Sequence, residues 1–165
     1  MLKTSSDWLL LFSLILLSQL AGVIGSVFTF SAIPSWYVTL TLPAFAPPSW
    51  IFGPVWTTLY TVMGIALFMV MKKRGIEPSR AKARTWGIRL FWTQLVVNAL
   101  WSVLFFGMRN PTAALVDIIV LDALVIAVVV LFARVSRTAM LLMLPYLGWI
   151  LFATYLNLNI VLLNP

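Results

Sequence analysis

The 165-residue sequence contains no cysteine and no histidine, and only four of its residues are acidic. The chain therefore lacks the side chains that form disulfides, that most often act as nucleophile or general base, and that commonly ligate zinc or haem iron. The sequence predicts no metal site and no conventional catalytic constellation. It says nothing about the redox compartment of the protein.

Charge of either sign is scarce: 9% of the residues are charged and 62% are hydrophobic, with a mean hydropathy of +1.05. Soluble domains carry roughly 25% charged residues, so this composition indicates an integral multi-pass membrane protein. Five apolar stretches reach the length of about 20 residues that crosses a bilayer: 8–30, 49–71, 86–106, 112–133 and 138–163. We expect an all-α fold, a compact bundle of five transmembrane helices that forms a single domain over residues 1–165.

The basic residues are unevenly distributed along the chain. An odd number of spans places the termini on opposite sides, and most basic residues then fall on the N-terminal side: Lys3, Lys72, Lys73, Arg74, Arg80, Lys82, Arg84, Arg134 and Arg137. Arg109 falls on the other side, and Arg89 lies just inside the third span. The positive-inside rule predicts a cytoplasmic N-terminus and an external C-terminus, in a plasma or inner membrane. We interpret the positive charge as a topology signal and a contact with anionic lipid, and expect no nucleic-acid partner.

Three spans carry stripes of residues that differ from the surrounding apolar sequence. In the first span the stripe is Ser18, Gly22, Gly25 and Thr29, which we interpret as a surface for close helix packing. In the third it is Gln94, Asn98, Trp101 and Phe105, at i, i+4, i+7 and i+11 of a helix. In the fifth it is Tyr146, Trp149, Ala153, Asn157 and Ile160, where Ala153 leaves space for a flat group. The last two stripes indicate either interhelical packing, with amide hydrogen bonds worth about 1 kcal/mol, or a ligand pocket.

Residues 31–48 form a long connection without charge that is rich in proline and aromatic residues. Long connections without secondary structure are uncommon unless they have a function. We favour a lid over a pocket, with Trp36, Tyr37 and Phe45 in the lid and Trp56, Gln94, Trp101 and Trp149 in the pocket wall. The alternative is an aromatic belt at the membrane surface.

Two carboxylates, Asp117 and Asp122, lie within the fourth span. Five residues correspond to about 140° around a helix, so the two groups do not form a dyad in one site. A charged aspartate near the bilayer centre costs about 3 kcal/mol, so each carboxylate requires a partner, a proton or a cavity. For Asp117 we weigh a buried hydrogen-bond anchor against a proton or cation site. The sequence offers no evident partner for Asp122.

Four segments of the chain resemble a known family. They are SWYVTLTLPAFAPPSWIFGPVWTTLYTVMG, QLVVNALWSVLFFGM, AALVDIIV and PYLGWILFATYLNLN, in order from about Trp36 to Asn157. These segments are similar to the signature segments of the tryptophan-rich sensory protein and translocator protein family (TspO/MBR), also called the peripheral benzodiazepine receptor family. The resemblance implies a five-helix membrane bundle, commonly a homodimer, with a pocket beneath the first loop.

The resemblance also implies a ligand class and a set of pocket residues. Members of the family bind tetrapyrroles such as protoporphyrin IX and haem, as well as isoquinoline and benzodiazepine drugs, and some bacterial members have been linked to light-dependent porphyrin breakdown. The implied pocket residues in this sequence are Trp56, Tyr60, Gln94, Asn98, Trp149 and Ala153. To these we add Trp101 and Tyr146 from the stripes described above. Asp117 matches the aspartate of the family's fourth span.

The sequence departs from the family pattern in two places. Where many relatives carry Lys-Pro-Ser-Trp before the double proline, this chain has Leu-Pro-Ala-Phe at residues 42–45, so a basic lid residue is missing. We therefore expect Arg109 to meet a porphyrin propionate at the pocket mouth. In the fifth span, Leu158 and Leu162 replace the tyrosine and arginine of the proposed cholesterol motif, so the sequence does not support sterol binding.

Three functions remain open. The first is a tetrapyrrole-binding sensor or regulator, in which aromatic faces stack on the macrocycle while Gln94 and Asn98 orient its polar atoms. It needs no obligatory cofactor, and without histidine or cysteine we expect metal-free porphyrin to bind about as well as haem. The second is an enzyme that degrades porphyrin in light through Trp56 and Trp149. The third is a transporter, for which Asp117 and Asp122 are the only coupling candidates within the membrane.

Overall fold

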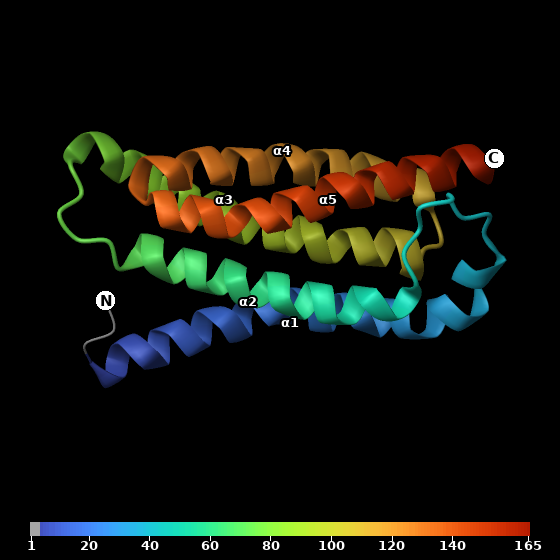
Figure 1. The fold of residues 1–165 in the computed structure, drawn as a ribbon, viewed down its shortest axis with the longest axis horizontal. Helices are drawn as coiled ribbons and strands as arrows, with labels where there is room; N and C mark the ends of the chain where they lie inside the picture. Colours follow the sequence, from blue (N-terminus) through green and yellow to red (C-terminus); the bar gives the residue numbers. More distant parts are fainter. Residues whose placement is uncertain (1–3) are drawn as a thin grey trace.

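The computed structural model describes residues 4–165, and Lys3 of the topology argument lies outside the described residues. Over this range the chain forms a bundle of five long helices without strands (Figure 1). The helices are α1 (Ser5–Ser35), α2 (Phe52–Met71), α3 (Pro78–Ser102), α4 (Pro111–Val135) and α5 (Arg137–Leu163). Three short elements join them: the 3-10 turns η1 (Tyr37–Thr39) and η2 (Ser49–Ile51), and the π-helix η3 (Val103–Gly107). All five helical segments are long and apolar enough to cross a membrane, which confirms the expected fold class.

The two ends of the bundle carry different connections. The N-terminus lies at the same end as the α2–α3 connection and the α4–α5 turn, whereas the C-terminus lies at the end with the α1–α2 and α3–α4 connections (Figure 1). The basic residues of positions 72–84 and 134–137 therefore share the N-terminal end, and Arg109 lies at the other. We call these the N-terminal end and the C-terminal end of the bundle.

Several helix boundaries differ from those expected from hydropathy. α1 continues five residues past the expected end at Phe30, through Pro34. There the Ser35 hydroxyl donates to the carbonyl of Ser31 at 2.7 Å and gives a partner to a carbonyl of the last turn. α2 begins three residues later than expected because η2 precedes it, and α3 begins eight residues earlier. The first turns of α3 are polar, with Pro78 at a position where no backbone N–H is needed, so a hydropathy criterion misses them.

Helix packing places α4 on the outside of the cavity described below. α4 packs against α3 and α5, α1 packs against α2 and α3, and α2 also contacts α5. α1 and α2 approach closely at Gly64, where an added Cβ atom would lie 2.7 Å from the Cα atom of Ile15. The interior holds side chains without exposed surface: Met63, Leu67, Phe91, Val125, Phe132 and Met143.

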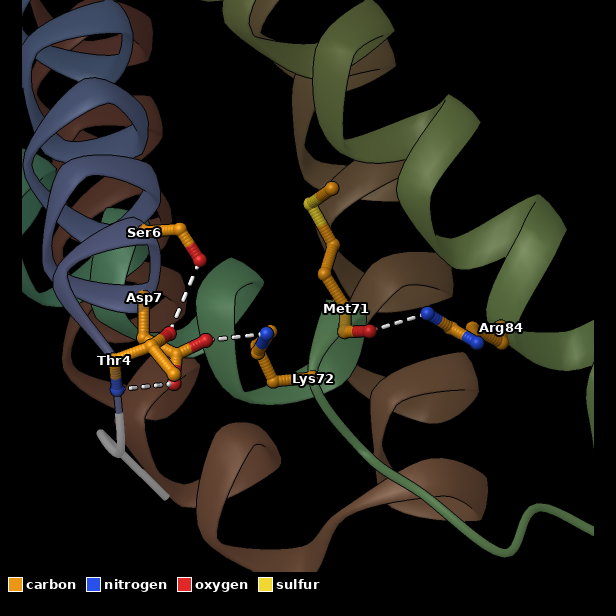
Figure 2. A network of polar contacts seen from close by, with 6 residues as sticks. All are labelled: Thr4, Ser6, Asp7, Met71, Lys72 and Arg84. Carbon is orange, nitrogen blue, oxygen red and sulfur yellow. Dashed lines mark hydrogen bonds and ion pairs between the residues drawn. The ribbon is translucent and has the colours of Figure 1, made fainter.

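Polar contacts tie the helix ends together at both ends of the bundle. At the N-terminal end, buried Asp7 of α1 forms an ion pair with Lys72, and Arg84 of α3 donates to the backbone carbonyl of Met71 (Figure 2). At the C-terminal end, the side chain of Asn164 accepts from the Thr41 backbone N–H at 2.9 Å and donates to its carbonyl at 3.1 Å. The α1–α2 connection is thus held to the end of α5.

Candidate ligand-binding cavity

A cavity of about 450 Å³ lies in the C-terminal half of the bundle, enclosed by α1, α2, η1, η3 and α5 together with the end of α3. No residue of α4 lines it. Several lining residues of α1 are exposed on the outside of the bundle, among them Val23 at 56% and Phe30 at 87%. The cavity therefore reaches the membrane-facing surface beside α1.

Aromatic rings form most of one wall. Trp56, Tyr60, Trp101, Phe105 and Trp149 all line the cavity. The Trp56 ring stacks on Tyr60 with centroids 5.2 Å apart, and the Trp101 ring stacks on Phe105 with centroids 4.9 Å apart. Such offset contacts contribute about 0.5–1.5 kcal/mol beyond area burial, so the wall is a stable arrangement of flat apolar faces.

The indole nitrogens of two wall tryptophans differ in their hydrogen bonding. Trp101 donates its N–H to Oδ1 of Asn157 at 3.0 Å, and Asn157 in turn donates to the carbonyl of Pro111 at 2.8 Å. The N–H of Trp149 is buried and has no hydrogen-bond partner within residues 4–165. A buried donor without a partner costs about 1–3 kcal/mol, and the residue that carries this donor lines the cavity.

α1 contributes several small residues to the cavity lining. Gly22, Gly25, Ser26 and Thr29 all line the cavity. An added Cβ atom would lie 2.6 Å from the Tyr60 ring at Gly22 and 2.8 Å from Oγ of Ser102 at Gly25. Of the first-span stripe expected to pack, Gly22, Gly25 and Thr29 also bound the cavity, whereas Ser18 is buried and does not line it. The pattern of small residues was visible in the sequence, but the space beside it was not.

Three of the expected pocket residues lie behind the wall rather than in it. Gln94, Asn98 and Tyr146 are buried and do not line the cavity. Tyr60 donates to Oδ1 of Asn98, Asn98 donates to the Tyr146 hydroxyl at 3.2 Å, and Tyr146 donates to Oε1 of Gln94 at 2.7 Å. These hydrogen bonds join α2, α3 and α5. In the structure the amides of Gln94 and Asn98 therefore hold helices together, which was one of the two alternatives for this stripe.

Comparison with known proteins assigns the family. The sequence profile of the TspO/MBR family matches residues 14–163. The chain belongs to this family. It is 50% identical over 143 residues to "Tryptophan-rich protein TspO" of Archaeoglobus fulgidus, covering 87% of this chain and 89% of that one. It is 44% identical over 144 residues to the protein of the same name from Chlorobaculum tepidum, with coverage of 87% and 89%. Against "Translocator protein" of Homo sapiens the identity is 35% over 150 residues, with coverage of 91% and 87%. The chain is therefore an integral multi-pass membrane protein of the TspO/MBR family.

In this TspO/MBR protein the expected lid residues lie in three different surroundings. Tyr37 of η1 is 8% exposed, lines the cavity and contacts the ring of Phe106 at 5.9 Å between centroids. Trp36 packs edge-on against Phe105 at 5.5 Å without lining the cavity. Phe45 is 75% exposed and also lies outside the lining, so it does not cover the cavity in this structure. Burial raises the pKa of Tyr37 above its ordinary value of 10.0, and this phenol stays neutral at physiological pH.

A π-helix reshapes the end of α3. In η3 the backbone N–H of Met108 bonds to the carbonyl of Val103 at 2.8 Å, five residues earlier. This wider turn changes the helical register at Phe105, and both Phe105 and Phe106 line the cavity. π-bulges are rare and occur often at functional sites. The sequence pattern assumed a regular helix and therefore missed Phe106.

Arg109 is exposed in the short turn between η3 and α4 and does not line the cavity. Its backbone has a φ of 52°, a left-handed conformation that is uncommon for residues other than glycine. The contact of Arg109 with a ligand propionate stays a prediction of the sequence.

The two carboxylates of α4 lie outside the cavity lining. Asp122 accepts a hydrogen bond from the Thr154 hydroxyl of α5 at 2.8 Å, a partner that the sequence did not reveal. Asp117 is buried, and its Oδ2 has no hydrogen-bond partner within the described chain. Within residues 4–165, no cluster of acidic side chains has the composition of a metal site.

Proposed function

We propose that this protein is a membrane sensor or regulator that binds a tetrapyrrole, protoporphyrin IX or haem, in the cavity bounded by α1, α2 and α5. The observation that carries the proposal is the Trp149 indole, whose buried N–H has no partner within residues 4–165 and which belongs to a wall of aromatic rings. A macrocycle with polar atoms on a flat apolar body matches both features.

The shape and surroundings of the cavity support a flat apolar ligand. Its volume of about 450 Å³ falls within the range of roughly 300–1,000 Å³ typical of small-molecule sites. The rings of Trp56 and Trp101 provide stacking faces, and Ala153 of α5 lines the cavity one turn from Trp149. Because the cavity reaches the membrane-facing surface beside α1, a ligand dissolved in the bilayer has a direct route of entry.

Binding in this site does not require iron. Neither histidine nor cysteine occurs in the sequence, and the Tyr60 hydroxyl already donates to Asn98. We therefore expect protoporphyrin IX and haem to bind with similar affinity. A strong preference for haem would contradict this part of the proposal.

The test is a titration of the purified protein in detergent with protoporphyrin IX in the dark, followed by tryptophan quenching. Trp149→Phe keeps the ring area but removes the N–H, and loss of one hydrogen bond should weaken binding about fivefold. The matched control is Trp50→Phe, because Trp50 is 73% exposed and does not line the cavity. Absence of saturable binding by the unmodified protein, or equal affinities of the two variants, would overturn the proposal.

Light-driven porphyrin breakdown is a second candidate, favoured by one feature of the wall. Trp56 contacts Tyr60 and also Tyr146, at 6.2 Å between centroids, and both hydroxyls are hydrogen bonded. Rings in contact allow an electron to move from Tyr60 to Trp56 after photoexcited porphyrin has taken an electron from Trp56. Illumination of the bound complex distinguishes the two functions: loss of pigment absorbance that depends on Trp149 indicates an enzyme, and a stable spectrum indicates a sensor.

Two further proposals concern assembly and transport. The family resemblance favours a homodimer, which the mass of the protein–detergent complex in light scattering will test. Transport has less support, since Asp117 and Asp122 both lie outside the cavity lining. The transport function would gain support if the protein takes up porphyrin into proteoliposomes and Asp117→Asn or Asp122→Asn abolishes this uptake.

A further inference from the structure

A second hollow lies at the N-terminal end of the bundle, whereas the cavity lies in the C-terminal half. It has a volume of about 690 Å³ and lies between the α2–α3 connection and the first turns of α3. Its polar lining consists of four cations and one threonine: Lys73, Arg74, Arg84, Arg89 and Thr85. Its apolar lining includes Ile76 and Ile88. We propose that this groove binds the phosphodiester headgroup of an anionic phospholipid from the surrounding leaflet.

Basic side chains outnumber carboxylates at this end of the bundle, where the described carboxylates are Asp7 and Glu77. At this end of the bundle, the ion pairs found within residues 4–165 join Lys72 to Asp7 and Arg80 to Glu77, the latter at 3.7 Å. None of them includes a cation that lines the groove. Four cations around one hollow repel one another, and an anion between them relieves this repulsion. The groove therefore favours a ligand with at least one negative charge.

Arg84 is held in place before any ligand arrives. Its guanidinium donates to the backbone carbonyl of Met71, and the side chain points from α3 toward the end of α2 (Figure 2). A guanidinium has five N–H donors in a rigid fork, so this one bond leaves others for phosphate oxygens. Pre-ordering reduces the entropy that a long side chain loses on binding. Gly75, with a φ of 64°, supplies the left-handed turn of the connection that forms the other side of the groove.

The position of the groove relative to the membrane favours a lipid over a soluble phosphate compound. α3 is long and apolar enough to span from Arg80 onward, so Arg84 and Arg89 lie on the first turns of a membrane helix. The guanidinium of Arg89 lies 5.2 Å from the ring centroid of Trp86, which is 53% exposed, as expected for a tryptophan at a membrane interface. Ile76 and Ile88 provide apolar contacts for the glycerol and upper acyl carbons. Basic pockets beside membrane helices are known to recognise anionic lipid headgroups.

The experiment measures lipid retention by the full-length protein in detergent, using native mass spectrometry with phosphatidylglycerol or phosphatidylcholine. We expect the unmodified protein to retain phosphatidylglycerol preferentially. Removing the groove arginines should reduce that preference by about fivefold for each arginine, in Arg89→Gln alone and in the double variant Arg84→Gln/Arg89→Gln. The single variant keeps the test valid if loss of the Met71 contact impairs folding.

The matched control removes two charges from the same end of the bundle without touching the groove. Lys82 and Arg137 are exposed and do not line it, so Lys82→Gln/Arg137→Gln should keep the preference. Equal retention of the two lipids by the unmodified protein would overturn the proposal, as would equal losses in the control and groove variants. Displacement of the lipid by inorganic phosphate at the same concentration would show a site for soluble phosphate and would also overturn it.

Discussion

The hydroxyl of Tyr146 donates to Oε1 of Gln94 at 2.7 Å, and neither side chain has any exposed surface. Tyr146 also accepts from Nδ2 of Asn98, so one phenol provides partners for two amides of α3. In a bilayer interior no water replaces a lost partner. This contact places Tyr146 at the centre of the polar chain that joins α3 to α5.

Tyr146→Phe should therefore destabilise the bundle. The substitution removes the Tyr146 partner of two buried amide atoms, Oε1 of Gln94 and Nδ2 of Asn98, each at a cost of about 1–3 kcal/mol. We expect a lower midpoint of thermal unfolding in detergent, followed by intrinsic fluorescence. The control is Tyr155→Phe, because Tyr155 is 44% exposed. A midpoint that falls equally in both variants would contradict this role.

Gly64→Ala should weaken the contact between α1 and α2. The new Cβ atom would lie 2.7 Å from the Cα atom of Ile15 and 2.9 Å from its backbone nitrogen, and backbone atoms do not move aside as a flexible side chain does. Overpacking of this kind costs about 1–3 kcal/mol. Gly148→Ala is the control, because a Cβ atom there meets nothing within 4 Å and alanine favours the helix. Thermal unfolding should show a lower midpoint for Gly64→Ala and an equal or higher one for Gly148→Ala.

Ionisation of the buried Tyr37 phenol should lower the stability of the protein at high pH. Burial raises the pKa of this phenol above its ordinary 10.0, so the unfolded chain ionises at a lower pH than the folded protein. The stability contributed by neutral Tyr37 is present below that ordinary value and is lost as the pH rises through the folded pKa. Tyr37→Phe should reduce the fall in unfolding midpoint between about pH 8 and about pH 11. An unchanged fall would show that Tyr37 does not contribute.

Arg109→Ala tests the expected contact with a ligand propionate. The variant should bind protoporphyrin IX more weakly, by about tenfold or more, since a hydrogen bond to a charged group contributes about 1.5–3 kcal/mol. The dimethyl ester of the same porphyrin carries no carboxylate, so its affinity should not change. Lys82→Ala removes a cation from the opposite end and serves as the control. Unchanged affinity for protoporphyrin IX in Arg109→Ala would show that this contact does not form.

Much of the helical layout was predictable because hydropathy depends only on residue type. The apolar runs located five spans, but they missed the polar first turns of α3 and the extension of α1 to Ser35. Hydrogen bonds decide these boundaries, such as that from Ser35 to the Ser31 carbonyl, and hydropathy does not report them.

The sequence predicted some of the residues of the candidate site but not how they are arranged. Helical spacing identified the faces that carry Trp149 and Ala153, and both line the cavity. The same rule placed Gln94 and Asn98 on an inward face, but it does not say which neighbour fills the space in front of them. That neighbour is Tyr146, which lies one turn from Trp149 and bonds to both amides. The spacing of residues within a helix determines which way their side chains face. Which residue fills the space in front of them depends on how the other helices pack.

The sequence by itself determined that the chain spans a membrane with five helices, because apolar length and the scarcity of charge leave no soluble alternative. It also determined the family, through four ordered segments. Only the tertiary structure decided that α4 stays outside the cavity, that the π-helix brings Phe106 into the wall, and that Trp149 keeps an unpaired N–H within the described chain. These features depend on contacts between residues distant in sequence, and no local pattern encodes where two helices leave a space between them.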